Sequence, residues 1–109
     1  ELGMKVCLAY NPPTSICGEE LFPLVDEILI MSVNPGFGGQ KFIPGTLEKI
    51  RKLRKVFSRN IKVDGGINRE TIFQVLEAGA NVLVMGTSFF RNPQIKELLS
   101  ILKEKYGER

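Results

Sequence analysis

Apolar residues along this chain fall into short continuous runs and longer segments with helical spacing. The continuous runs predict strands at 5–10, 27–33, 61–63 and 82–85. The run at 27–33 lacks the polar alternation of a strand with one wet face, so this strand is expected to be covered on both sides. Proline or glycine follows each run and ends it, because neither residue propagates regular structure.

Segments with apolar spacings of three and four residues predict amphipathic helices at 45–57, at 69–78 and from Pro93 onward. Asn68 is the expected N-cap of the second of these helices, and Gly79 is its expected end. A brief helix at 19–25 is expected to be interrupted near Pro23. The positions predicted to face inward are Leu47, Ile50, Leu53, Val56, Phe57, Ile72, Val75, Leu76, Ile95, Leu98, Leu99 and Leu102.

Strand, loop and helix therefore recur four times, which predicts an α/β protein with a parallel sheet. In such folds the turns that follow the strands gather at one end of the sheet, where ligands bind. The glycine-rich turns of this sequence all follow predicted strands, so any binding site is expected at that end.

The formal charge of +3 over 109 residues raises the question of a nucleic-acid partner. Most cations lie in two predicted helices, and Glu48 is placed to pair with Lys52 four residues later. No aromatic residues interleave with these cations for base stacking, so a solvated helix face is favoured over nucleic-acid binding. No apolar run approaches the roughly 20 residues of a membrane span, which leaves the cytoplasm as the expected compartment.

The cysteines, Cys7 in a predicted strand and Cys17 in a loop, form no CxxC pair, and the sequence contains no histidine. A zinc site built from these residue types is therefore not expected. Two reduced structural thiols are the favoured interpretation.

Glycine-rich turns are the first candidate chemistry. Without side chains, backbone N–H groups at these turns can converge on an anion, as phosphate-binding loops require. A single such turn is more typical of a plain surface loop, but three glycine-bearing turns after predicted strands favour a binding site. Phe37 lies between glycines and could cover such a site. The residues predicted to surround a phosphate are Gly38, Gly39, Gly65, Gly66, Gly86 and Thr87.

Asp64 is the second candidate, a carboxylate at the C-terminal end of a predicted strand. Its position suits a general acid or base, or a ligand to a divalent metal. The local sequence equally allows a turn residue that caps the next helix through an Asx bond.

Three motifs, MSVNPGFGGQKF at 31–42, VDGGIN at 63–68 and AGANVLVMG at 78–86, closely resemble the C-terminal half of the ribulose-phosphate 3-epimerase family. The similarity covers nearly the whole chain. The sequence departs from the family pattern at 10–15 (YNPPTS), where the family usually has leucine before the asparagine and proline after the threonine. The related hexulose-6-phosphate 3-epimerases share much of the pattern, so the choice between pentose and hexose phosphate stays open.

The resemblance implies an eight-stranded βα barrel that interconverts D-ribulose 5-phosphate and D-xylulose 5-phosphate by proton transfer at C3, assisted by a divalent metal (zinc, iron, manganese or cobalt). It assigns Asp64 as one acid/base group and a metal ligand. Met31 matches a methionine that lines the pocket, although core packing explains it equally well. The implied substrate and phosphate contacts are Gly36, Phe37, Gly38, Gly39, Gly65, Gly66, Gly86 and Thr87.

A full barrel needs roughly 200 to 250 residues, so residues 1–109 are expected to form a single C-terminal half of a (β/α)8 TIM barrel with four βα units. The remaining metal ligands and the second acid/base carboxylate are implied to belong to the first four strands, so the isolated chain is expected to be inactive. The open sheet edges at 5–10 and 82–85 predict association with another half or a second copy. A phosphate-binding or assembly module without catalysis is the alternative.

Overall fold

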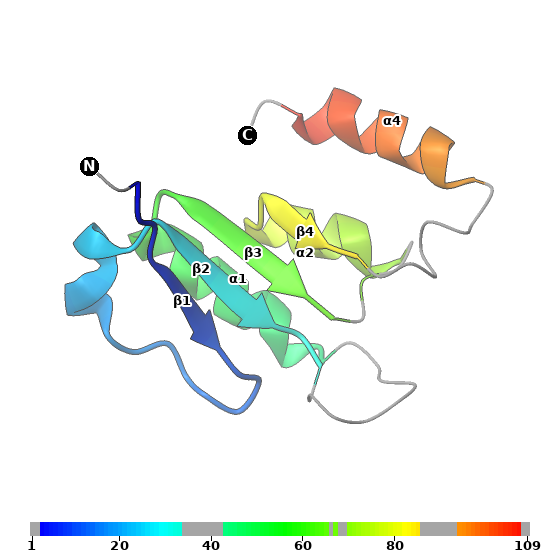
Figure 1. Cartoon of the computed structure of the whole chain (residues 1–109). Helices are drawn as coiled ribbons and strands as arrows, with labels where there is room; N and C mark the ends of the chain where they lie inside the picture. Colours follow the sequence, from blue (N-terminus) through cyan, green and yellow to red (C-terminus); the bar gives the residue numbers. More distant parts are fainter. Residues whose placement is uncertain (1–2, 34–42, 66, 68–69, 86–93, 108–109) are drawn as a thin grey trace.

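The computed structural model describes residues 3–33, 43–65, 67, 70–85 and 94–107. These form four strands and four helical segments in alternation (Figure 1). The elements are β1 (Cys7–Tyr10), the 3-10 helix η1 (Glu19–Leu24), β2 (Glu27–Met31), α1 (Gly45–Val56), β3 (Asn60–Asp64), α2 (Thr71–Ala78), β4 (Val82–Val84) and α4 (Ile95–Tyr106). All the strands and helices expected from the hydrophobic pattern are thus present, with boundaries shifted by a few residues.

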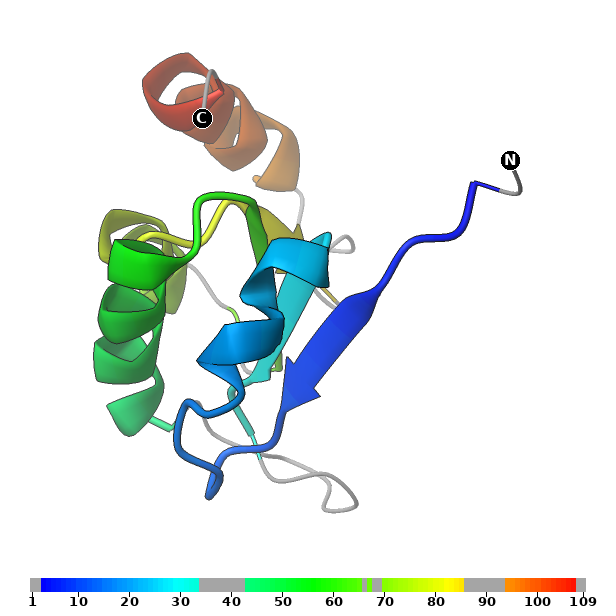
Figure 2. The ribbon, with the colours of Figure 1, turned by 90° about the vertical axis from the view of Figure 1, so that its left-hand side faces the viewer.

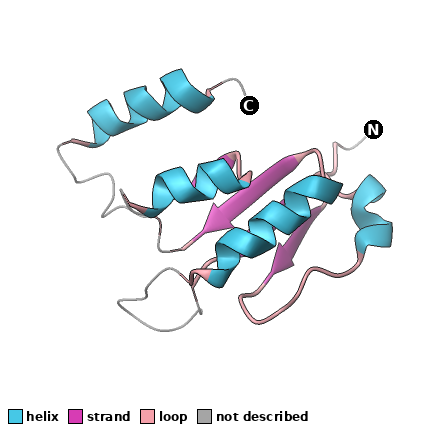
Figure 3. Cartoon of the chain, turned by 180° about the vertical axis from the view of Figure 1, so that it is seen from behind, coloured by secondary structure: helices cyan, strands magenta, loops and turns pink. Residues whose placement is uncertain are grey.

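The strands form one parallel sheet in the order β1-β2-β3-β4, the same as their order along the chain. Helices α1 and α2 both lie against one face of this sheet (Figures 2 and 3). Right-handed crossovers between successive neighbouring strands place every helix on the same side, whereas a doubly wound sheet reverses its strand order and places helices on both sides. The fold is therefore α/β and consistent with part of a TIM barrel.

The core lies between the sheet and α1. Alternate residues of the two central strands are completely buried, and so are the inward residues of α1; these are Ile28, Ile30, Ile61, Val63, Ile50 and Leu53. Phe22 of η1 packs edge-to-face on Phe57, with ring centroids 5.5 Å apart. A second cluster joins α4 to α2 through Leu98 and Leu102. No helix in the described part of the chain is both long and apolar enough to cross a membrane.

The expectation that strand 27–33 is covered on both sides is wrong for the described residues. Its residues alternate, with Ile28 and Ile30 buried beneath the helices and Glu27, Leu29 and Met31 only half-buried on the other face. On that face the described part of the chain places no helix (Figure 2). The continuous apolar run therefore reflects a partly covered second face rather than a second helical layer.

Four smaller predictions also need correction. Val56 is 58% exposed instead of buried, because α1 ends there and only Phe57 turns inward. Glu48 pairs with Arg51 three residues later, at 3.4 Å, and not with Lys52. Cys7 and Cys17 are both exposed free thiols, so they are not packed in the core. Helix α2 begins at Thr71 and has Glu70 at its N-cap position, instead of the predicted Asn68, which lies outside the described residues.

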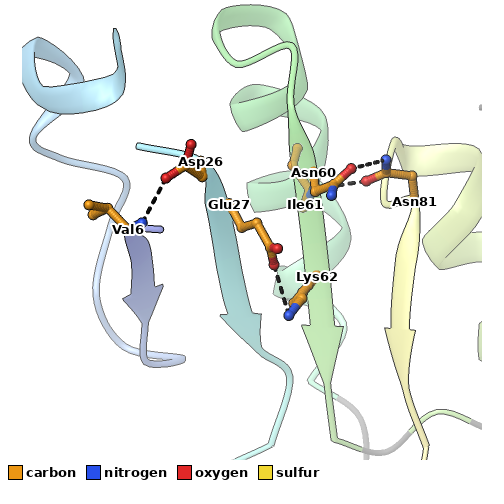
Figure 4. Close-up of polar contacts among 7 residues, drawn as sticks. All are labelled: Val6, Asp26, Glu27, Asn60, Ile61, Lys62 and Asn81. Atoms are coloured by element: carbon orange, nitrogen blue, oxygen red, sulfur yellow. Dashed lines mark hydrogen bonds and ion pairs between the residues drawn. The ribbon is translucent and has the colours of Figure 1, made fainter. Parts of the chain in front are cut away.

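The N-terminal ends of the strands are joined by polar contacts (Figure 4). The Asp26 carboxylate accepts a hydrogen bond from the Val6 N–H at 2.7 Å. Glu27 of β2 and Lys62 of β3 form an ion pair at 2.8 Å across the strands, and this hydrogen-bonded carboxylate raises the pKa of Lys62. We assign these contacts a role in stability, because the active sites of βα barrels lie at the opposite, C-terminal ends of the strands.

Arg54 joins two connections at the same end. Its guanidinium donates to the carbonyls of Gly79 at 2.9 Å and of Phe57 and Arg59 at 2.8 Å each. Its Nη2 also lies 3.3 Å from the side-chain oxygen of Asn81. One side chain therefore fixes the α1–β3 and α2–β4 turns relative to each other, using the fork geometry of a guanidinium.

We expect Arg54→Lys to lower the free energy of unfolding by about 2 kcal/mol, because an ammonium cannot reach all these carbonyls and the partly buried acceptors lose their partners. Urea unfolding followed by circular dichroism measures the change. Arg51→Lys is the matched control, because Arg51 is an exposed residue of the same helix and should shift the midpoint very little. Equal stability of the two variants would contradict the role of Arg54.

Candidate functional site

The C-terminal ends of the four parallel strands lie at one end of the sheet (Figure 1). The chain leaves β2, β3 and β4 at this end, where the sequence predicts the candidate catalytic and binding residues. Strand-to-helix turns of parallel sheets meet here, and ligands of such folds bind at this end.

Met31 and Asp64 are neighbours at this end of the sheet. The register of the sheet pairs Met31 with Asp64 and Asp64 with Val84, so these residues occupy one row across β2, β3 and β4. Residues of this row alternate with the buried Ile30 and Val63, which places them on the face away from the helices. Met31 and Asp64 therefore lie side by side on the same face of the sheet.

The Asp64 side chain is half-buried and accepts no hydrogen bond from any residue that the structure describes. A carboxylate in this state can exchange a proton with a bound molecule, because none of its lone pairs is already used by those neighbours. The backbone of residue 66, which an Asx turn would use, lies outside the described residues.

Ser32 holds the backbone that carries Asp64. This serine is completely buried, and its hydroxyl donates to the Asp64 carbonyl at 2.9 Å and also to the Gly65 carbonyl. The Ser32 N–H donates to the same Asp64 carbonyl at 2.9 Å. Sequence reasoning missed this residue, although a small polar residue at the end of an apolar run is a signal that could have indicated it.

Gly65 follows Asp64 with a backbone φ of +108°, a conformation that side chains other than glycine rarely adopt. A Cβ built on Gly65 would lie 2.6 Å from a methyl carbon of Val33. The close packing of these two turns therefore requires glycine at this position, and it fixes how the chain departs from the carboxylate.

The other predicted contacts lie outside the described residues, so their convergence on a phosphate stays a prediction. They are Gly36, Phe37, Gly38, Gly39, Gly66, Gly86 and Thr87.

The described residues offer few ligands for a metal ion. Within the described ranges no three histidine, cysteine, aspartate or glutamate side chains lie close enough to bind one ion. Asp64 supplies one oxygen ligand of a suitable kind, whereas divalent cations in proteins need about four or more ligands. The described residues alone do not form a metal site.

Comparison with known proteins gives consistent matches. The profile of the Ribulose-phosphate 3 epimerase family matches residues 1–90. A ribulose-phosphate 3-epimerase of Candida glabrata is 46% identical over 107 residues, covering 96% of this chain and 44% of that protein. The enzyme of the same name from Synechocystis is 47% identical over 106 residues, covering 92% and 46%.

A rice protein called the cytoplasmic isoform of ribulose-phosphate 3-epimerase is 43% identical over 109 residues, covering 94% of this chain and 47% of its own length. The chain thus spans about half the length of the curated relatives it matches.

Proposed function

The chain belongs to the ribulose-phosphate 3-epimerase family, and on this premise we propose that it serves the interconversion of D-ribulose 5-phosphate and D-xylulose 5-phosphate. The observation that carries the proposal is the position of Asp64, at the C-terminal end of β3 in one row with Met31. A carboxylate without a hydrogen-bond partner among the described residues suits proton transfer to and from carbon.

The proposed step begins at C3 of the ketose, which is acidic because it lies next to the C2 carbonyl. Asp64 removes the C3 proton, the C–H electrons form the C2–C3 double bond, and the carbonyl π electrons move to the C2 oxygen. Return of a proton to the opposite face of C3 gives the epimer, so the reaction needs a second acid on that face. Asp64 acts as the base in one direction and as the acid in the other.

The proposal also includes a metal site and a phosphate site, and the described residues form neither of them completely. A divalent metal, of which Asp64 would be one ligand, would stabilise the negative charge on the enediolate oxygen, with its other ligands drawn from elsewhere. The phosphate would be bound by backbone N–H groups at Gly36, Gly38, Gly39, Gly66, Gly86 and Thr87, with Phe37 and Met31 against the sugar.

We also propose that residues 1–109 correspond to the C-terminal half of an eight-stranded barrel. The sequential strand order, the helices on one face and the coverage of about half of each relative support this assignment. Closure of the barrel would cover the inner face of the sheet and bring a second carboxylate opposite Asp64. A cytoplasmic location is part of the same proposal, supported by the name of the rice relative.

The proposed function is tested by assaying the 109-residue chain alone and together with the N-terminal half of the Synechocystis relative, each with added divalent metal. Epimerisation of D-ribulose 5-phosphate that requires both polypeptides is the expected result. A well-folded mixture without turnover would overturn the proposal and favour a phosphate-binding or assembly module. Turnover of a hexulose 6-phosphate in preference to the pentose would reassign the substrate.

Association through the open sheet edges is a further expected property of the isolated chain. Val84 of β4 is 41% exposed at one edge of the sheet. We expect Val84→Lys to weaken concentration-dependent association by about tenfold, because lysine at an edge opposes strand pairing. Analytical ultracentrifugation measures this. Ile101→Lys, which alters a similarly exposed residue of α4, is the control and should leave association unchanged.

A further inference from the structure

The turn that follows β1 carries a polar side chain to the same row as Asp64. Asn11 comes directly after Tyr10, the last residue of β1, and precedes Pro12. A residue before proline is restricted to extended backbone, so the alternation of the strand continues through Asn11. The Asn11 carbonyl then accepts a hydrogen bond from the Thr14 N–H at 3.0 Å, which closes a β-turn.

The register of the sheet fixes the position of Asn11 along the strand direction. Tyr10 pairs with Ile30, so the next position of β1 lies beside Met31, the partner of Asp64. Tyr10 is buried, whereas Cys7 and Ala9 are exposed on the face away from the helices. Alternation therefore places Asn11 on the face that also carries Asp64.

The backbone at Asn11 is held from outside the strand. Lys49 of α1 reaches across the edge and donates from Nζ to the carbonyls of Asn11 at 3.2 Å and Pro12 at 2.9 Å. Desolvation by burial lowers the pKa of this lysine. The Tyr10 hydroxyl donates to the Cys17 carbonyl and ties down the far side of the same loop.

The Asn11 side chain is exposed and has no hydrogen-bond partner among the described residues. It is a neutral group with two donors and an acceptor, which matches the hydroxyl groups of a sugar. Asn11 and Asp64 are two strand spacings apart, roughly 10 Å. Both side chains extend onto the same face from positions on either side of β2, so one sugar bound between them can place C3 at Asp64 and a hydroxyl group at Asn11.

We propose that Asn11 binds a hydroxyl group of the sugar phosphate and that Lys49 positions it for this contact. The inference rests on the proposed function, because it takes the same ligand at the same edge. It adds a specificity-determining residue from the β1 turn, which the motif comparison did not assign.

The test titrates the 15N-labelled 109-residue chain with D-ribulose 5-phosphate and, separately, with inorganic phosphate, and follows the side-chain amide resonances by NMR. Asn11→Ala should weaken binding of the sugar phosphate about tenfold and leave phosphate binding unchanged, because only the sugar carries the hydroxyl. Ser15→Ala, an exposed change in the same loop, is the control and should alter neither affinity.

Equal affinity of wild type and Asn11→Ala for the sugar phosphate would overturn the role of Asn11 and leave the proposed function standing. Equal losses of affinity for sugar phosphate and for inorganic phosphate would also overturn the role of Asn11, because the contact would then not involve the sugar. If the wild-type chain binds neither ligand even when it is combined with the N-terminal half of the Synechocystis relative, the proposed function itself fails.

The positioning role of Lys49 is tested separately. Lys49→Ala should speed hydrogen exchange of the Thr14 amide and weaken sugar-phosphate binding several-fold, with rescue by Lys49→Arg. Lys52→Ala, on the exposed face of the same helix, should change neither quantity. Faster exchange without any loss of affinity would overturn the positioning role.

Discussion

Asp64→Asn is expected to reduce epimerisation by about 1000-fold in the two-polypeptide assay, the largest effect anticipated for any single change. Asparagine keeps the shape of the side chain but cannot take up the C3 proton, and a positioned acid or base contributes about 100- to 10,000-fold to such reactions. The measurement is turnover of D-ribulose 5-phosphate, with exchange of the C3 proton for deuterium in heavy water as an independent readout. Both should be lost together.

Asp26→Asn is the matched control for this variant. Asp26 also lies at a strand terminus, but at the N-terminal end of β2, where it accepts a hydrogen bond from Val6. An amide oxygen can still accept that bond, so turnover should stay within twofold of wild type. Retention of a tenth or more of the activity by Asp64→Asn would exclude Asp64 as the acid/base residue.

Gly65→Ala is expected to lower the free energy of unfolding by about 3 kcal/mol. Part of this cost is the positive φ of +108°, and part is the 2.6 Å approach of the new Cβ to Val33. Because Ser32 binds the carbonyls of both Asp64 and Gly65, the change should also displace the carboxylate. Urea unfolding measures the stability, and proton transfer is measured as for Asp64→Asn.

Gly18→Ala separates the two contributions. Gly18 has a φ of +77°, but the nearest atom to an added Cβ is 4.0 Å away. This control should cost only about 1 kcal/mol, the penalty for the backbone conformation alone. If both variants lose the same stability, the close packing of Gly65 against Val33 contributes nothing.

The periodicity of the sequence predicts the helices because each helix is buried on one side, and it predicts the strands because each is a short apolar run that proline or glycine ends. It fails where tertiary position overrides spacing. Val56 has the correct helical spacing but lies in the last turn of α1, beyond the reach of the sheet. Glu48 has two cations within reach, and spacing alone does not decide between Arg51 and Lys52.

The site was predicted less completely than the fold. Asp64 and Met31 were predicted from their motifs, and their shared row follows from parallel pairing. The contacts of Ser32 and the role we propose for Asn11 were not predicted, because they depend on which residues lie beside them in neighbouring strands. The residues that lie beside each other in neighbouring strands are fixed only when the strands pair in the assembled sheet.

Sequential strand order has a consequence for how this sheet assembles. Each strand pairs with the strands immediately before and after it in the chain, so every new strand can dock on one already formed. Folding of many parallel sheets is slowed by the entropy cost of closing long loops. Here each pairing step closes only the one crossover between consecutive strands. The sheet can therefore grow unit by unit in the direction of synthesis, and β1 and β2 can pair while the rest of the chain is still on the ribosome.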